Sequence, residues 1–224
     1  MLGMVHFAWL AAIAAAAILL TKTCRRRVAA GGSCGGLLHG FGLALACNEG
    51  IWWGFRYSHE GLHVWNLPLQ LCDVTVWGAV FACLTAAPAV AEFTYFAGLA
   101  GAGMALLTPD LWSPWPSYPA AYFFLAHGGV VIAAAMLGFG GAARFRRGAP
   151  WRAFRALLGY AALAGAVDAI TGANYMYLRR KPAAGSLLNA FGPWPWYLFP
   201  SAAAAALIFR ALWIPARRAQ SAGD

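Results

Sequence analysis

The chain has 224 residues, of which 62% are apolar and only 10% are charged, and its mean hydropathy is +0.62. Soluble domains carry about 25% charged residues, so this composition excludes a soluble globule and predicts a single integral membrane helical domain over residues 1–224. The net charge of +9 indicates basic loops at a membrane face rather than nucleic-acid binding, because no basic stripe interleaves with aromatic residues outside the apolar segments.

Several apolar segments are long enough to cross a bilayer, which takes about 20 residues. The first run, from Val5 to Leu20, has no preceding positive charge and no obvious cleavage site, so we interpret it as a retained span rather than a signal peptide. In chain order the predicted spans are 4–21, 37–54, 67–86, 90–107, 119–141, 155–174 and 196–214. The sequence therefore predicts an all-α bundle of about seven transmembrane helices.

Basic residues gather on one side of these spans. Twelve of the 16 follow the first span, surround the loop after the fifth or lie near the C-terminus: Lys22, Arg25, Arg26, Arg27, Arg144, Arg146, Arg147, Arg152, Arg155, Arg210, Arg217 and Arg218. Cytoplasmic loops are rich in Lys and Arg. We therefore expect this side to be cytoplasmic, with the N-terminus outside and the C-terminus inside.

A basic triple breaks this pattern, because Arg179, Arg180 and Lys181 fall on the predicted outer side. Arginine pairs bidentately with phosphate oxygens, so the triple is a candidate phosphate-binding site for a lipid headgroup. The alternatives are an outer loop that simply tolerates three charges and a wrong count of spans.

Polar residues inside the apolar segments fall toward the same outer side. Such residues are costly in hydrocarbon and mark functional sites. The predicted polar pocket consists of His6, Asn48, Glu49, His63, Gln70, Cys72, Asp73, His127, Asp168 and Asn174. The inner halves of the spans hold almost nothing ionisable, so random scatter explains this distribution poorly.

Cys72 and His127 form the predicted catalytic pair. Asn66 and Pro68 resemble the cap and first turn of a helix, which would place Cys72 about one turn in, where the helix dipole favours a thiolate. His127 lies at a similar depth on another span and could take the thiol proton and return it. A packing cysteine and a structural histidine are the alternatives.

Other members of the pocket have predicted supporting roles. Asp73 or Asp168 could orient the His127 imidazole, as the acid of a catalytic triad does. Gln70, Asn174 or the first backbone amides of the third span could stabilise an oxyanion.

Metal and disulfide chemistry have weaker signals. Residues 59–63 read HEGLH and match HExxH, but that motif needs a helix, and here it sits in a short loop with a central glycine. We therefore predict no metal site and assign His63 to the protein surface or to the rim of the pocket. Five scattered cysteines without a CxxC motif indicate neither a disulfide framework nor a structural zinc site.

Five sequence blocks carry a family resemblance: NLPLQLCDVTVW, YFAGLAGAGMALLTPDLW, FFLAHGG, NYMYLRRKP and LLNAFGPWPWY. They resemble the YwaF-like integral membrane proteins of bacteria and, more distantly, the animal transmembrane protein 164 family. The resemblance implies a multi-pass protein of the bacterial cytoplasmic membrane. It also implies an enzyme that moves fatty acyl groups between phospholipids, with Cys72 and His127 at the catalytic positions.

Together these features predict a phospholipid acyltransferase that works without a cofactor. Cys72 would form an acyl-thioester, with His127 as general base and with phospholipid and lysophospholipid as partners. Three alternatives stay open: a lipid ester hydrolase with the same Cys/His pair, a non-enzymatic transporter, and a metal-dependent membrane hydrolase.

Overall fold

The computed structural model describes residues 3–111, 113–182 and 187–221, and every regular element within them is helical. The elements are α1 (Met4–Ala29), α2 (Gly35–Glu60), α3 (Leu71–Thr85), α4 (Pro88–Phe93), the π-helix η1 (Thr94–Gly98), α5 (Leu99–Leu107), α6 (Tyr118–Phe139), α7 (Ala149–Thr171), the 3-10 helices η2 (Tyr175–Tyr177) and η3 (Leu187–Phe191), and α8 (Leu198–Ser221). The predicted all-α class is confirmed.

Five helical segments are long and apolar enough to cross a membrane: α1, the run α4–η1–α5, α6, α7 and α8. The chain is therefore a multi-pass membrane protein. Helix α3 is apolar but has only 15 residues, which span about 22 Å at 1.5 Å per residue, less than the ~30 Å hydrocarbon core. Helix α2 has 26 residues but is not among the five. The total of seven spans stays a prediction.

Helix α6 forms the centre of the bundle, where it packs against α1, α2, α3 and α5. Two adjacent glycines allow this close approach. A Cβ on Gly128 would lie 2.7 Å from the Ile13 side chain of α1, and one on Gly129 would overlap Leu45 of α2. The two glycines therefore serve helix packing and do not leave room for a substrate.

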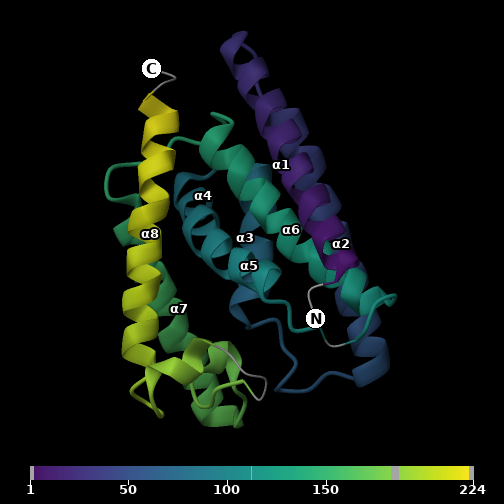
Figure 1. Cartoon of the computed structure of the whole chain (residues 1–224), viewed down its shortest axis with the longest axis vertical. Coiled ribbons are helices and arrows are strands. Elements are labelled where there is room, and N and C mark those ends of the chain that lie inside the picture. Colours follow the sequence, from purple (N-terminus) through teal and green to yellow (C-terminus); the bar gives the residue numbers. More distant parts are fainter. Residues whose placement is uncertain (1–2, 112, 183–186, 222–224) are drawn as a thin grey trace.

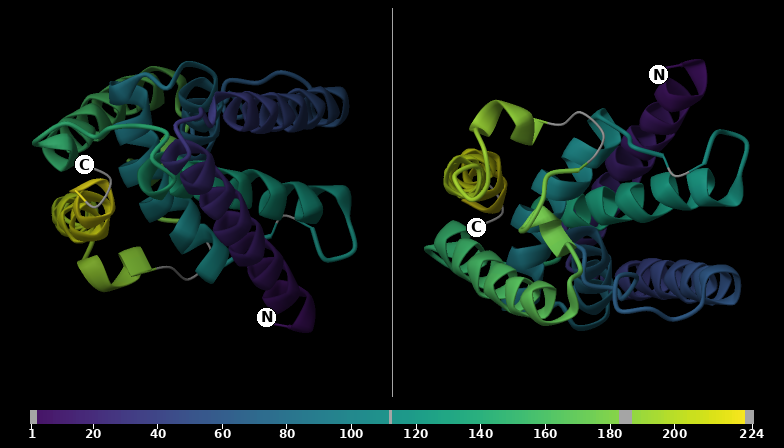
Figure 2. Two further views of the ribbon diagram at one scale, coloured as in Figure 1. Left: turned by 90° about the horizontal axis from the view of Figure 1, so that it is seen from above. Right: turned by 90° about the horizontal axis from the view of Figure 1, so that it is seen from below.

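Helices α7 and α8 pack against each other, and Figure 2 shows α8 and α2 at opposite edges of the bundle. The two chain termini lie toward opposite ends of the bundle (Figure 1). A buried carboxylate ties the α7 side to α4, because Glu92 is 1% exposed and pairs with Arg146 at 3.0 Å and Arg152 at 2.8 Å. Two of the basic residues that gather on one side of the predicted spans, Arg146 and Arg152, thus link the α7 side of the bundle to α4.

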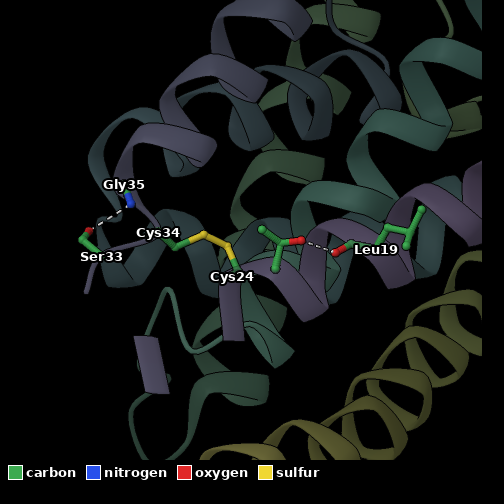
Figure 3. The surroundings of a disulfide bond; sticks show 6 residues. Leu19, Cys24, Ser33, Cys34 and Gly35 are labelled. Atoms are coloured by element: carbon green, nitrogen blue, oxygen red, sulfur yellow. Dashed lines mark hydrogen bonds between the residues drawn. A yellow bond between two sulfur atoms is a disulfide. The ribbon is translucent and has the colours of Figure 1, made fainter. Parts of the chain in front are cut away.

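A disulfide joins Cys24 in the last turns of α1 to Cys34 at the start of α2 (Figure 3). The expectation that the cysteines form no disulfide was wrong for this pair. The tight turn between the two helices brings their Cα atoms to 5.1 Å, a spacing typical of disulfides, and sequence spacing alone does not show this proximity. Cys47, Cys72 and Cys83 are free.

Candidate active site

The start of α3 differs from the sequence prediction. Gln70, not Asn66, occupies the N-cap position, and the Asp73 carboxylate accepts the Gln70 backbone N–H at 2.9 Å, as the acid of a capping box does. Asn66 instead accepts the His63 backbone N–H at 2.9 Å and so fixes the preceding loop. Proline restrains the residue before it to extended backbone, which favours a loop rather than a helix around Pro68.

Cys72 is consequently the second residue of α3 rather than one full turn in. Its thiol is free, and the residue is partly exposed. The first N–H groups of a helix lack intrahelical partners, and they carry the positive end of the helix dipole. This position therefore places the first N–H donors of α3 beside any negative charge that develops at Cys72 during a reaction.

A cavity of about 480 Å³ brings Cys72 and His127 together. Its walls come from α2, α3, α5, α6 and η2 and from the loops before α3 and after α5. Cys72 contributes from the first turn of α3, and His127 contributes from the third turn of α6. The structure thus places both predicted catalytic residues on one cavity, although they are 55 positions apart in the sequence.

The His127 ring is held by its own helix. Its Nδ1 lies 2.8 Å from the carbonyl oxygen of Phe123, and since a carbonyl only accepts, Nδ1 carries the proton and Nε2 keeps the lone pair. The expectation that Asp73 or Asp168 orients this ring was wrong. Asp73 caps α3, and the Asp168 carboxylate accepts the Tyr175 backbone N–H at 2.7 Å, so neither acid is needed to fix the tautomer.

The two predicted oxyanion donors differ in what they contact. Gln70 lines the cavity, and its Oε1 accepts the Met176 backbone N–H at 2.9 Å, which leaves the amide nitrogen as a donor. The Asn174 side chain does not line the cavity. Its oxygen accepts the backbone N–H groups of Arg179 and Arg180, each at 3.0 Å, so the predicted oxyanion role of Asn174 was wrong.

Glu49 lies behind the cavity wall. It is completely buried, and the Tyr122 hydroxyl donates to its two carboxylate oxygens at 2.9 and 3.1 Å. Tyr122 itself lines the cavity, and Asn48 lies beside the same carboxyl. Glu49 therefore positions a cavity residue instead of facing the cavity.

His6 and His63 lie away from the cavity. The His6 Nε2 is 2.7 Å from the Leu106 carbonyl oxygen, which links α1 to α5. His63 is exposed and stacks on Trp65, a cavity residue, with ring centroids 4.5 Å apart. His63 therefore contacts a cavity residue without lining the cavity, and its place at the rim stays a prediction, whereas His6 is a packing residue.

The HExxH match does not form a helical metal motif. Helix α2 ends at Glu60, and Gly61 follows with φ 74°, so His59 and His63 do not share a helix face. In the described ranges, no group of three or more His, Cys, Asp or Glu residues could hold a metal ion.

Comparison with known proteins adds one finding, a match of residues 1–213 to the model of the TMEM164 family. The chain belongs to the TMEM164 family. This match supports the predicted relation to transmembrane protein 164, but it does not support the YwaF-like assignment. No curated protein and no solved structure matches the chain.

Sequence reasoning missed several polar residues of the cavity in this TMEM164-family chain. Among them, Arg56, Asp110 and Tyr177 line its wall. Arg56 pairs with Glu60 at 2.9 Å and lies 5.3 Å from the centre of the Trp53 ring, so it provides a cation at the wall. An arginine just after the end of a predicted apolar segment was the available signal. Burial raises the pKa of the Tyr177 phenol, which keeps it protonated and able to donate.

The cavity wall at η2 has unusual backbone geometry. Met176 and Tyr177 have φ values of 53° and 56°, in the left-handed region where a non-glycine residue costs about 1–2 kcal/mol. The Met176 N–H bond to Gln70 and the Tyr197 hydroxyl bond to the Tyr177 carbonyl hold this segment. Strain of this kind gathers at functional sites.

None of the three residues of the basic triple lines the Cys72 cavity. Arg179 and Arg180 line a second pocket of about 490 Å³ with Gly172 and Trp194. Lys181 points elsewhere, with its ammonium 5.5 Å from the centre of the Tyr197 ring.

Proposed function

We propose that this TMEM164-family protein is a membrane-embedded phospholipid acyltransferase that forms an acyl-thioester on Cys72. The observation that supports this most is the shared cavity, in which a free thiol at a helix N-terminus and a histidine with an available Nε2 line the same walls. A thiol nucleophile paired with a positioned base is the arrangement that covalent acyl transfer requires.

In the first half-reaction, His127 Nε2 takes the Cys72 proton and the sulfur attacks the ester carbonyl carbon of a phospholipid. The ester C–O bond breaks, and the departing lysophospholipid oxygen receives the proton from His127. In the second half-reaction, His127 deprotonates the hydroxyl of another lysophospholipid, which attacks the thioester. The C–S bond breaks, and the proton returns to the thiolate.

Two features of the cavity suit this chemistry. Gln70 lines the cavity with Cys72, its amide nitrogen is available as a donor, and the first backbone N–H groups of α3 lack intrahelical partners; these donors could stabilise a tetrahedral oxyanion. The Arg56 guanidinium on the same wall offers a cation to the phosphate of the lipid.

The same pair would catalyse hydrolysis if water replaced the lysophospholipid in the second half-reaction, so the assay must separate the two products. Transfer requires that a lipid hydroxyl reaches the thioester before water does.

We also propose a location in the bacterial cytoplasmic membrane, with seven spans, the N-terminus outside and the C-terminus inside, on the basis of the basic face. The Cys24–Cys34 disulfide lies on that face, although disulfides persist mainly in oxidising compartments. Both cysteines are buried, at 0% and 3% exposure, which limits access of reductants to the bond.

The test compares wild type, Cys72→Ala and Cys47→Ala in nanodiscs that contain a phospholipid donor and an isotopically labelled lysophospholipid. Product lipids are measured by mass spectrometry. Labelled phospholipid should form with wild type and Cys47→Ala, because Cys47 is an exposed thiol of α2 outside the cavity, and not with Cys72→Ala. Transfer by Cys72→Ala would refute the mechanism, and free fatty acid as the sole product would change the reaction to hydrolysis.

A further inference from the structure

The second pocket, lined by Gly172, Arg179, Arg180 and Trp194, has no residue in common with the Cys72 cavity. The two are nevertheless neighbours in the chain, because η2 lies between Gly172 and Arg179 and contributes to the cavity wall. One short segment thus carries the wall of the cavity and then the arginines of the second pocket.

Several contacts fix the shape of this pocket. The Asn174 carboxamide accepts the backbone N–H groups of Arg179 and Arg180 and donates to the Arg180 carbonyl at 2.9 Å. The Arg179 guanidinium donates to the backbone carbonyl of Asp168 at 3.0 Å. Gly172 has φ 79°, which favours glycine, and a Cβ there would lie 3.9 Å from the Arg179 guanidinium.

The pocket has an unbalanced positive charge. Within the described part of the chain, neither Arg179 nor Arg180 forms an ion pair with a carboxylate. The nearby Asp168 side chain is fully buried and accepts the Tyr175 backbone N–H. Two guanidinium groups on one pocket match the bidentate geometry of phosphate oxygens.

The pocket has an aromatic wall, which is typical of sites at the headgroup level of a membrane. The Trp194 indole N–H donates to the Leu178 carbonyl at 2.9 Å, which holds the ring in place, while 58% of the residue remains exposed. Exposed tryptophans of membrane proteins concentrate at the headgroup region. Arginine and tryptophan together therefore fit the phosphate and glycerol region of a lipid.

We propose that this pocket is a second phosphate-binding subsite, which holds the headgroup phosphate of one lipid while another occupies the Cys72 cavity. Its role as the waiting position for the incoming lysophospholipid rests on the proposed acyl transfer. Such a subsite would hold the second lysophospholipid close to the Cys72 cavity, separated from it by η2, at the time when the first lysophospholipid leaves.

The test measures binding without turnover, in the full-length chain carrying Cys72→Ala. Native mass spectrometry counts bound palmitoyl-lysophosphatidylglycerol, and a parallel titration uses inorganic phosphate alone. We expect two lipids per chain. Arg180→Gln should weaken one of the two binding events at least tenfold. Lys181→Gln is the matched control and should leave both unchanged, because Lys181 lies over Tyr197 and not in the pocket.

Arg180→Gln is the preferred variant because, within the described residues, its guanidinium makes no hydrogen bond, so its loss should not unfold the loop. Arg56→Gln should weaken the other binding event only. Unchanged lipid binding in Arg180→Gln would overturn the proposal. The proposal would also be overturned if the binding of inorganic phosphate depended on Arg180 and the binding of lipid did not. If the wild-type protein showed no acyl transfer but the variants changed lipid binding as expected, the second subsite would be supported and the proposed function would be refuted.

Discussion

Removing the Tyr122 hydroxyl tests whether the buried Glu49 carboxyl holds this side of the cavity together. Tyr122→Phe deletes the group that donates to both carboxylate oxygens, at 2.9 and 3.1 Å, of a residue with no exposure. A buried acceptor left without its hydrogen-bond partner costs about 1–3 kcal/mol. We expect a loss of about 2 kcal/mol, which lowers Tm by about 4–8 °C for a chain of this length.

Thermal unfolding of the purified protein in detergent, followed by size exclusion after heating, measures this change. Tyr118→Phe is the matched control, since the buried Tyr118 hydroxyl has no partner in the described ranges, and its Tm should stay within about 1 °C. Equal Tm values for wild type and Tyr122→Phe would refute the reasoning.

Four further predictions address packing, chemistry and topology. Gly129→Ala should destabilise the fold by about 1–3 kcal/mol through overlap with Leu45, whereas Gly54→Ala, where a Cβ meets nothing within 4 Å, should be neutral; denaturation in mixed micelles distinguishes them. His127→Gln should slow acyl-thioester formation by about 10²–10⁴-fold, measured by single-turnover mass spectrometry, and a change under threefold would contradict its role as base. A C-terminal green fluorescent protein fusion should fluoresce and an alkaline phosphatase fusion should be inactive; the reverse would invert the proposed orientation. Thiol alkylation of the denatured chain should label three cysteines without reductant and five with it, and five without reductant would exclude the disulfide.

The helical architecture was predictable because it depends on local properties. Each apolar run predicted as a span lies largely within a helix, since backbone groups in hydrocarbon must be satisfied inside their own segment. The beginning of α3 was misplaced because Asn66 and Gln70 are both plausible caps. Which of them caps the helix depends on contacts with His63 and Met176, which sequence periodicity does not contain.

The candidate site was predictable in its two central residues and less so around them. Cys72 and His127 stand out because ionisable groups are rare in apolar runs. Their surroundings depend on which side chain reaches which partner across helices. The partners of Asp168, Asn174 and Lys181 became clear only from their contacts with Tyr175, the backbone after η2 and Tyr197.

By itself, the sequence determined that the chain is a helical multi-pass membrane protein, because composition and run length fix how its segments partition between bilayer and water. It also singled out Cys72 and His127 by their chemistry. Only the tertiary structure placed them on one cavity, added Arg56 to its wall, separated Arg179 and Arg180 into a second pocket and joined Cys24 to Cys34. These relations arise from the packing of distant segments against α6 and around η2, and local sequence patterns carry no information about such distances.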